Sequence, residues 1–338
     1  MERLDMLRAH CEMWTGPIAA VVYAPLLGSN LVSLDMPHLN GTTVADQSAH
    51  LAAVHAELEA AGPCRLDLDL TSEAVPSYWL SGHYPFNALR NRALLLVRTQ
   101  VILLLDVDFL PSAALSRNLT QPGAYAALAE QLEQRIAVVL PAFEPTESGE
   151  AGTVVARQAV SGGKQAVVQG YEAGMLKPFQ VDRYPKGHSP TGYERWVVAV
   201  KPYRIRYREG YEPYLLLARK YVPWYDERFR GYGKDKIVQI SHLATWISFV
   251  VHPWAFVVHQ PHGQSRAYKV TKKTGQWNEL FRLYAEVQGL VAKGEYTPVS
   301  AYSCASSQRA PGLQAPQNRR KRPAFGRPGK LASEHERV

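Results

Sequence analysis

The chain has 338 residues, of which 46% are hydrophobic and 10% aromatic, so it can bury a substantial core. Its formal net charge of +8 would indicate nucleic-acid binding if it were spread over the folded part, but +6 of it falls in residues 309–338 and +2 in residues 1–308. We therefore expect no nucleic-acid partner for the folded part. Only the basic run at 319–322 (RRKR) leaves that alternative open for the tail.

Other composition signals exclude a membrane span and a cysteine framework. No charge-free apolar run is long enough to cross a bilayer, and the first residues lack the apolar region of a signal peptide. Cys11, Cys64 and Cys304 are scattered, and they have neither metal-ligand spacing nor the pattern of a disulfide framework.

The first third of the chain alternates predicted helices and strands. In chain order these are helix 2–14, strand 18–23, helix 46–61, strand 65–70, helix 86–98 and strand 101–105. Amphipathic spacing identifies the first helix, and Gly16-Pro17 ends it. This rhythm is typical of a mostly parallel α/β sheet.

The remainder predicts more strands and then an unfolded tail. The predicted strands are 135–143, 196–200, 203–207 and 213–218, with a glycine-rich stretch at 161–174 and a loop at 186–190. From residue 305 the chain is rich in proline, glycine, glutamine and basic residues, which favours disorder. We predict one domain over residues 1–300 and a disordered basic tail over 305–338.

The strongest chemical signal is the pair Asp106 and Asp108, which follows the buried strand 101–105. Strand side chains alternate, so the two carboxylates are expected to point the same way. Two such carboxylates at the end of a strand can hold a divalent cation against a phosphate, as the DxD motif of nucleotide-sugar glycosyltransferases does. An isolated pair would more often cap a turn, so the surrounding sequence decides between the two interpretations.

Eight segments, in order, resemble glycosyltransferase family 49, which contains the LARGE-type xylosyl/glucuronyltransferase domain and a β-1,4-glucuronyltransferase. The segments are LDMLRAHCEMWTGPIAAVVY (4–23), YPFNALRNRA (84–93), LLDVDFLPS (104–112), VVLPAFE (138–144), KGHSPTGYERW (186–196), EPYLLLAR (212–219), YDERFRGYGKDK (225–236) and AFVVHQPH (255–262).

The resemblance implies an α/β GT-A fold, with a Rossmann-like mixed sheet flanked by helices. It also implies a metal-dependent, inverting glycosyltransferase that moves glucuronic acid or xylose from a UDP-sugar donor to a glycan or glycoprotein acceptor. Mn²⁺ or Mg²⁺ is the expected cofactor, the Golgi lumen or membrane the expected location, and a homodimer is compatible with the family. Family members have a strand before the helix matched by residues 2–14, so we expect this domain to lack its first strand.

The family pattern places the metal on Asp106, Asp108 and His259, with His262 as the neighbour that could replace the histidine ligand. The residues expected to bind the donor are Asn87, Arg90, Asn91, Asp106, Lys186, His188, Gly231, Gly233 and Asp235. Asn87, Arg90 and Asn91 share one helix face, where a guanidinium could bind phosphate or a uronic carboxylate. Ordinary surface roles, a buried Arg–acid pair and a helix cap are the competing interpretations.

Inversion requires a base that takes the acceptor proton, and Asp226 and Glu144 are the first candidates, ahead of Glu227 and Asp235. An ion pair with Arg228 or Arg230 is the competing role for such acids. Asp235 and His242 stand where family members carry Asn and Glu, which leaves the sugar specificity open. The alternative function is a non-catalytic relative that binds a glycan or nucleotide.

Overall fold

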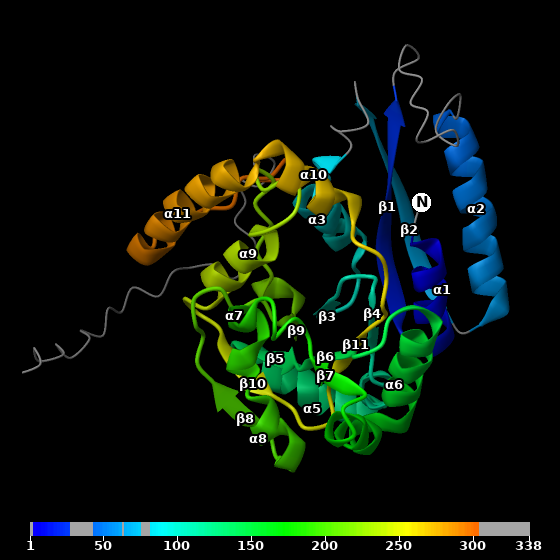
Figure 1. Cartoon of the computed structure of the whole chain (residues 1–338), viewed down its shortest axis with the longest axis vertical. Coiled ribbons are helices and arrows are strands. Elements are labelled where there is room, and N and C mark those ends of the chain that lie inside the picture. The colour runs from blue at the N-terminus through cyan, green and yellow to red at the C-terminus, as the bar shows by residue number, and fades with distance from the viewer. Residues whose placement is uncertain (1–2, 28–42, 63, 76–81, 304–338) are drawn as a thin grey trace, which may run out of the picture.

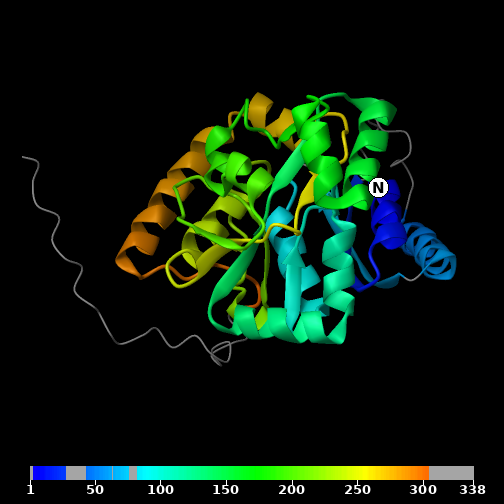
Figure 2. The ribbon, with the colours of Figure 1, turned by 90° about the horizontal axis from the view of Figure 1, so that it is seen from below.

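The computed structural model describes residues 3–27, 43–62, 64–75 and 82–303 (Figure 1). The predicted tail at 305–338 and Cys304 lie outside these ranges. The described chain is a mixed α/β structure with three sheets flanked by helices (Figures 1 and 2). It has the character of a GT-A-like glycosyltransferase fold, as the sequence predicted.

Two long parallel strands form a separate sheet near the amino terminus. β1 (Pro17–Leu27) and β2 (Arg65–Val75) pair along their full length, with Pro17 opposite Arg65 and Leu27 opposite Val75. α1 (Leu4–Met13) and α2 (Val44–Ala61) lie beside this sheet, with α2 on its outer side (Figure 1). Leu7, Leu58 and Leu66 form a small apolar core beneath the two helices.

The central sheet has the strand order β3 (Val101–Leu104), β9 (Tyr214–Ala218), β5 (Ile136–Leu140), β10 (Ser248–Val251) and β8 (Tyr203–Ile205). Only β5 and β10 run in parallel, while the other three pairings are antiparallel. The sheet is therefore mixed, as the resemblance implied, whereas the mostly parallel sheet indicated by the alternation of helices and strands was wrong. The reason is β9, which returns from the second half of the chain and inserts between β3 and β5.

The third sheet carries residues that matter for the site. Its order is β4 (Phe109–Pro111), β11 (Val257–His259), β6 (Ala142–Pro145) and β7 (Leu176–Pro178). β4 and β11 are antiparallel, and His259 pairs with Phe109. This register brings the end of β11 beside the turn that contains Asp106 and Asp108.

The remaining helices surround the central and third sheets (Figure 2). They are α3 (Phe86–Leu96), α4 (Ala113–Thr120), α5 (Pro122–Glu133), α6 (Gly149–Glu172), α7 (Pro185–His188), α8 (Tyr193–Val198), α9 (Asp235–Leu243), α10 (Arg266–Thr274) and α11 (Trp277–Lys293), with 3-10 turns at Ser189–Thr191 and Arg219–Tyr221. Within the described ranges, no helix combines the length and apolarity needed to cross a bilayer.

Three segments differ from the sequence-based expectation. Residues 196–200 were predicted as a strand, but α8 ends within them. In a strand, residues 196, 198 and 200 would share one face, yet Trp196 is fully buried whereas Val198 and Val200 are 77% and 85% exposed. The glycine-rich stretch at 161–174 belongs largely to α6, which Gly163 interrupts with a φ of 72°. The predicted loop at 186–190 contains the short helix α7.

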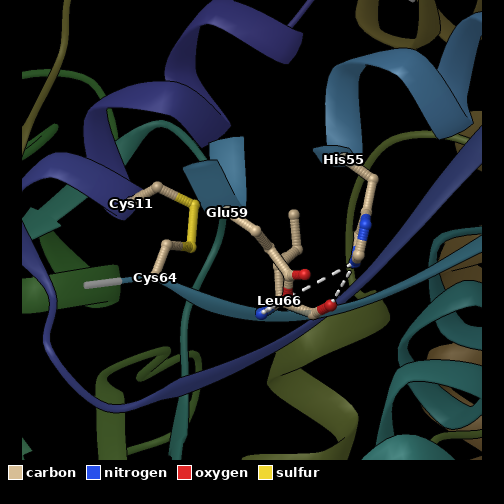
Figure 3. The surroundings of a disulfide bond; sticks show 5 residues. All are labelled: Cys11, His55, Glu59, Cys64 and Leu66. Atoms are coloured by element: carbon tan, nitrogen blue, oxygen red, sulfur yellow. Dashed lines mark hydrogen bonds and ion pairs between the residues drawn. A yellow bond between two sulfur atoms is a disulfide. The ribbon is translucent and has the colours of Figure 1, made fainter. Parts of the chain in front are cut away.

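A disulfide joins Cys11 of α1 to Cys64, directly before β2 (Figure 3). The expectation of unpaired, scattered cysteines was therefore wrong for these two. They are 53 residues apart in sequence, yet their Cα atoms lie 4.8 Å apart once the β1–β2 sheet forms. The same corner is held by α2, since His55 Nε2 lies 2.7 Å from the Leu66 carbonyl oxygen and the Leu66 N–H donates to Glu59.

Candidate active site

A cleft of about 1750 Å³ is lined by both the β1–β2 sheet and the strand ends of the other two sheets. Its lining includes the turn after β3, the residues leading into β9, the start of α9 and the loop after β11. Strand ends of this kind leave side chains free of the sheet core, which suits them for binding ligands.

Asp106 and Asp108 lie in the turn between β3 and β4, where the Phe109 N–H donates to the Asp106 carbonyl oxygen over 3.1 Å. The chain turns here instead of continuing as a strand, so the strand alternation on which the expected common direction rests does not apply to Asp106 and Asp108. The two acids have separate sets of partners.

Asp106 accepts three hydrogen bonds, each at 3.0 Å, from Arg90, Lys236 and the Tyr214 hydroxyl. The ammonium of Lys236 also lies 3.9 Å from the centre of the Tyr214 ring. Burial opposes ionisation of Asp106, but the charges of Lys236 and Arg90 hold its pKa well below the usual range. Asp106 therefore stays ionised between the positive charges of Arg90 and Lys236.

Asp108 faces two histidines. His262 Nε2 lies 2.9 Å from Asp108 Oδ2, and His259 Nε2 lies 3.9 Å from the same oxygen. One ligand atom from each of these three side chains lies within 4.8 Å of the others. Asp108 Oδ1 is buried and has no hydrogen-bond partner among the described residues, so it is free to bind a cation.

The chemistry of this cluster fits a divalent transition metal. Burial lowers the pKa of His259 to about 4, so its imidazole is neutral and can donate a lone pair at physiological pH. Burial opposes ionisation of Asp108, but the contact with His262 and the charge of Arg3 keep its pKa below normal. A carboxylate and two imidazoles suit Mn²⁺ better than Ca²⁺, which prefers oxygen ligands alone.

A guanidinium shares this position. Arg3 Nη1 lies 2.6 Å from Asp108 Oδ2, and Arg3 Nη2 lies 3.5 Å from His262 Nδ1. Arg3 therefore supplies the positive charge that a metal ion would otherwise supply, and a metal that uses Asp108 Oδ2 must displace it.

Four of the predicted donor-binding residues besides Asp106 line the cleft: Arg90, His188, Gly233 and Asp235. Asp235 is the first residue of α9, and its Oδ2 lies 2.5 Å from Arg90 Nη1. Because Arg90 also pairs with Asp106, the buried Arg–acid pair considered as an alternative is present. Burial and the charge of Lys236 lower the pKa of His188 to about 3, so this ring is neutral.

The other four are not among the lining residues. Asn87 and Asn91 are buried, and their amides donate to the carbonyl oxygens of Asp226 and Tyr225 over 2.8 and 2.9 Å. Lys186 is exposed on α7, and Gly231 packs against Gln276.

The two candidates for the catalytic base, Asp226 and Glu144, differ in whether they line the cleft. Asp226 is buried outside the cleft, where it accepts from Arg228 over 2.8 Å and from the Tyr296 hydroxyl over 3.0 Å. It therefore has the ion-pair role that was the competing interpretation. Glu144 lines the cleft, accepts from the Gln180 N–H, and lies 3.6 Å from Lys177. Burial raises the pKa of Glu144.

Three cleft residues were missed as individual site residues: Glu212, Tyr214 and Lys236. Each lies in a segment that resembles the family, EPYLLLAR or YDERFRGYGKDK, so the segments were the available signal. The sequence did not reveal the pairing of β9 with β3, which sets Tyr214 beside Asp106.

Comparisons with known proteins show to which family the chain is similar. The family model described as "Glycosyl-transferase for dystroglycan" matches residues 1–288. The human xylosyl- and glucuronyltransferase LARGE2 is 32% identical over 266 residues, and the mouse LARGE2 is 33% identical over 270, each match covering 78% of this chain. The human LARGE1 is 30% identical over 273 residues, or 80% of this chain. The matches cover 32%, 34% and 31% of those relatives, so the chain spans about a third of their length.

Proposed function

The chain belongs to the family of glycosyltransferases for dystroglycan, and from this membership we propose that it is a metal-dependent, inverting glycosyltransferase. The donor is a UDP-sugar that carries glucuronic acid or xylose, the two sugars in the names of the relatives. The acceptor is a glycan or glycoprotein. The alternative is a non-catalytic relative that binds the same ligands.

The observation that carries the proposal is the cluster of Asp108, His259 and His262 at the end of β11 and the start of β4. These residues would hold Mn²⁺ or Mg²⁺, and Asp106 lies two residues from the cluster in the same turn. When bound, the cation would neutralise charge on the departing diphosphate. Metal binding by Asp106 itself remains a prediction from the DxD motif.

The surroundings support an anionic, nucleotide-linked donor. Lys236 projects into the cleft beside Asp106 and offers a cation for a phosphate oxygen. Gly233 has a φ of 108°, and a Cβ atom there would lie 2.6 Å from the Trp277 ring, so only glycine gives this backbone its close approach before α9. Arg90 positions Asp106 and Asp235 at the same wall.

The disulfide supports a location in the secretory pathway. Structural disulfides form and persist in oxidising compartments, and Cys11–Cys64 fastens two elements beside the cleft. A Golgi lumen location, where a glycoprotein acceptor would be met, is consistent with this bond.

The test is a UDP-release screen of the purified chain against UDP-sugars, with Mn²⁺ and with EDTA. We expect release with one donor in Mn²⁺ and its loss in EDTA, because the cation holds the diphosphate. Asp108→Asn should lower release at least about 100-fold, since it removes a charged metal ligand. Asp5→Asn, an exposed acid on α1, is the matched control and should keep full activity.

Unchanged activity in Asp108→Asn or in EDTA would contradict the metal assignment. Binding of UDP without release for any donor or acceptor would favour the non-catalytic alternative.

A further inference from the structure

Glu212 lies directly before β9, two residues from Tyr214. Residues two apart in an extended chain project to the same side, and both line the cleft. Since the Tyr214 hydroxyl donates to Asp106 over 3.0 Å, Glu212 projects from the wall that holds the Asp106 turn.

The segment around α7 fixes the backbone of Glu212. Its N–H donates to the Gly187 carbonyl oxygen over 3.0 Å. A Cβ atom at Gly187 would lie 2.9 Å from Glu212 Oε1, so the absent side chain leaves the carboxylate its space. The Tyr184 ring lies against the same glycine, because that Cβ atom would also lie 2.7 Å from Tyr184 Cδ1.

Glu212 differs in its contacts from the acids described above. Among the described residues, no hydrogen bond or ion pair is found for its carboxylate, although the charges of Lys236 and Lys234 act on it. By contrast, Asp106, Asp108 and Asp235 each contact a cation. Glu144 is bonded to the Gln180 N–H. An acid that is enclosed in a cleft but left unpaired is available for a substrate hydroxyl.

The charges around Glu212 suit a proton acceptor near neutral pH. Burial raises its pKa to about 7, Asp235 and Asp106 add to this effect, and Lys236 and Lys234 oppose it. The titratable and charged groups that face it from β9, α7, the Asp106 turn and the start of α9 are Tyr214, Tyr184, His188, Asp106, Tyr232, Lys234, Asp235 and Lys236.

We propose that Glu212 is the catalytic base that takes the proton from the acceptor hydroxyl, in place of Glu144 or Asp226. The assignment deepens the proposed function and rests on it. The acceptor oxygen forms a bond to C1 of the donor sugar as its proton passes to a carboxylate oxygen of Glu212. The bond from C1 to the diphosphate oxygen breaks, and its electron pair leaves with UDP.

The test is Glu212→Gln, which keeps the size of the side chain but cannot accept the proton. We expect kcat for transfer to fall about 10²- to 10⁴-fold, the usual contribution of a general base. The Kd for UDP in Mn²⁺, measured by calorimetry, should stay within twofold of wild type, because no contact to the nucleotide is removed. Glu209→Gln, an exposed acid in the same loop, is the matched control and should retain wild-type kcat.

Glu144→Gln, made in parallel, should retain most of its activity. Wild-type activity in Glu212→Gln, a comparable loss of UDP affinity, or a loss confined to Glu144→Gln would overturn the assignment. A wild-type chain without metal-dependent transfer would overturn the proposed function, and the assignment of Glu212 with it.

The pH dependence gives a second readout. Only the ionised carboxylate accepts a proton, so wild-type kcat/KM should rise with pH up to about 7 and then level off. If Glu212→Gln does not fold, Glu212→Asp can replace it, because it keeps the carboxylate. This variant should shift the pH range over which kcat/KM rises, and an unchanged range would contradict the proposal.

Discussion

At the scale of single residues, Asp106 and Asp108 are separated by one residue but have different tasks. Asp106 is held by two cations and a hydroxyl, which makes it part of the wall between α3, α9 and β9. Asp108 faces His259 and His262 and keeps one oxygen without a partner. The two acids of one motif therefore differ in their surroundings, because Asp106 is held by cations whereas Asp108 keeps an oxygen available.

This difference predicts unequal stability for the two amide variants. Asp106→Asn should lower the free energy of unfolding by about 1–3 kcal/mol, because Lys236, with a side chain only 14% exposed, would lose its counterion and Arg90, 20% exposed, would keep only Asp235. Asp108→Asn should cost less, since Arg3 is 32% exposed and can turn toward water. Urea unfolding at pH 7 measures both, and an equal or larger loss in Asp108→Asn would contradict this division.

The residue-level prediction from sequence was strongest where chemistry and chain position coincide. Asp108 was identified because it follows an apolar strand, and His259 because the family pattern places a histidine there; the structure brings the two together. Asn87 and Asn91 were misplaced because a shared helix face does not reveal which neighbour it meets. Glu212 could not be singled out, because its lack of a partner is a property of the folded cleft.

At the scale of elements, the amino-terminal unit is joined by the disulfide, by α2 and by the parallel pairing of β1 with β2. Local patterns predicted α1, α2, β1 and β2 within a few residues. The same patterns failed for α8, where the hydrophobic run WVVAV has β-branched residues but only Trp196 is fully buried. The propensity of these residues for strands could not by itself distinguish α8 from true strands such as β1 and β2.

Removing the disulfide should destabilise this unit. The double variant Cys11→Ser/Cys64→Ser should lose about 2–4 kcal/mol of stability, because the link closes a long loop in the unfolded chain. Thermal unfolding with and without reductant measures the effect. Reductant should lower the wild-type Tm and leave that of the double variant unchanged, and a wild-type Tm insensitive to reductant would contradict the pairing.

At the scale of the whole molecule, the α/β class and the mixed sheet flanked by helices were predictable from the resemblance. The order of the strands was not, because β9 and β11 reach β3 and β4 from more than 100 residues away in sequence. Those two long-range pairings also assemble the site. The sequence therefore predicted which segments form the site, but not how these segments are arranged in space.

The size of the cleft has a kinetic consequence. Its volume of about 1750 Å³ exceeds the roughly 300–1000 Å³ of a typical single-ligand pocket, so donor and acceptor can occupy it together. Double-reciprocal plots at several fixed acceptor concentrations should therefore intersect, because the reaction passes through a ternary complex. Parallel lines would indicate that UDP departs before the acceptor arrives. That result would require a sugar held covalently by the protein, and the stereochemistry of the product would then be retained.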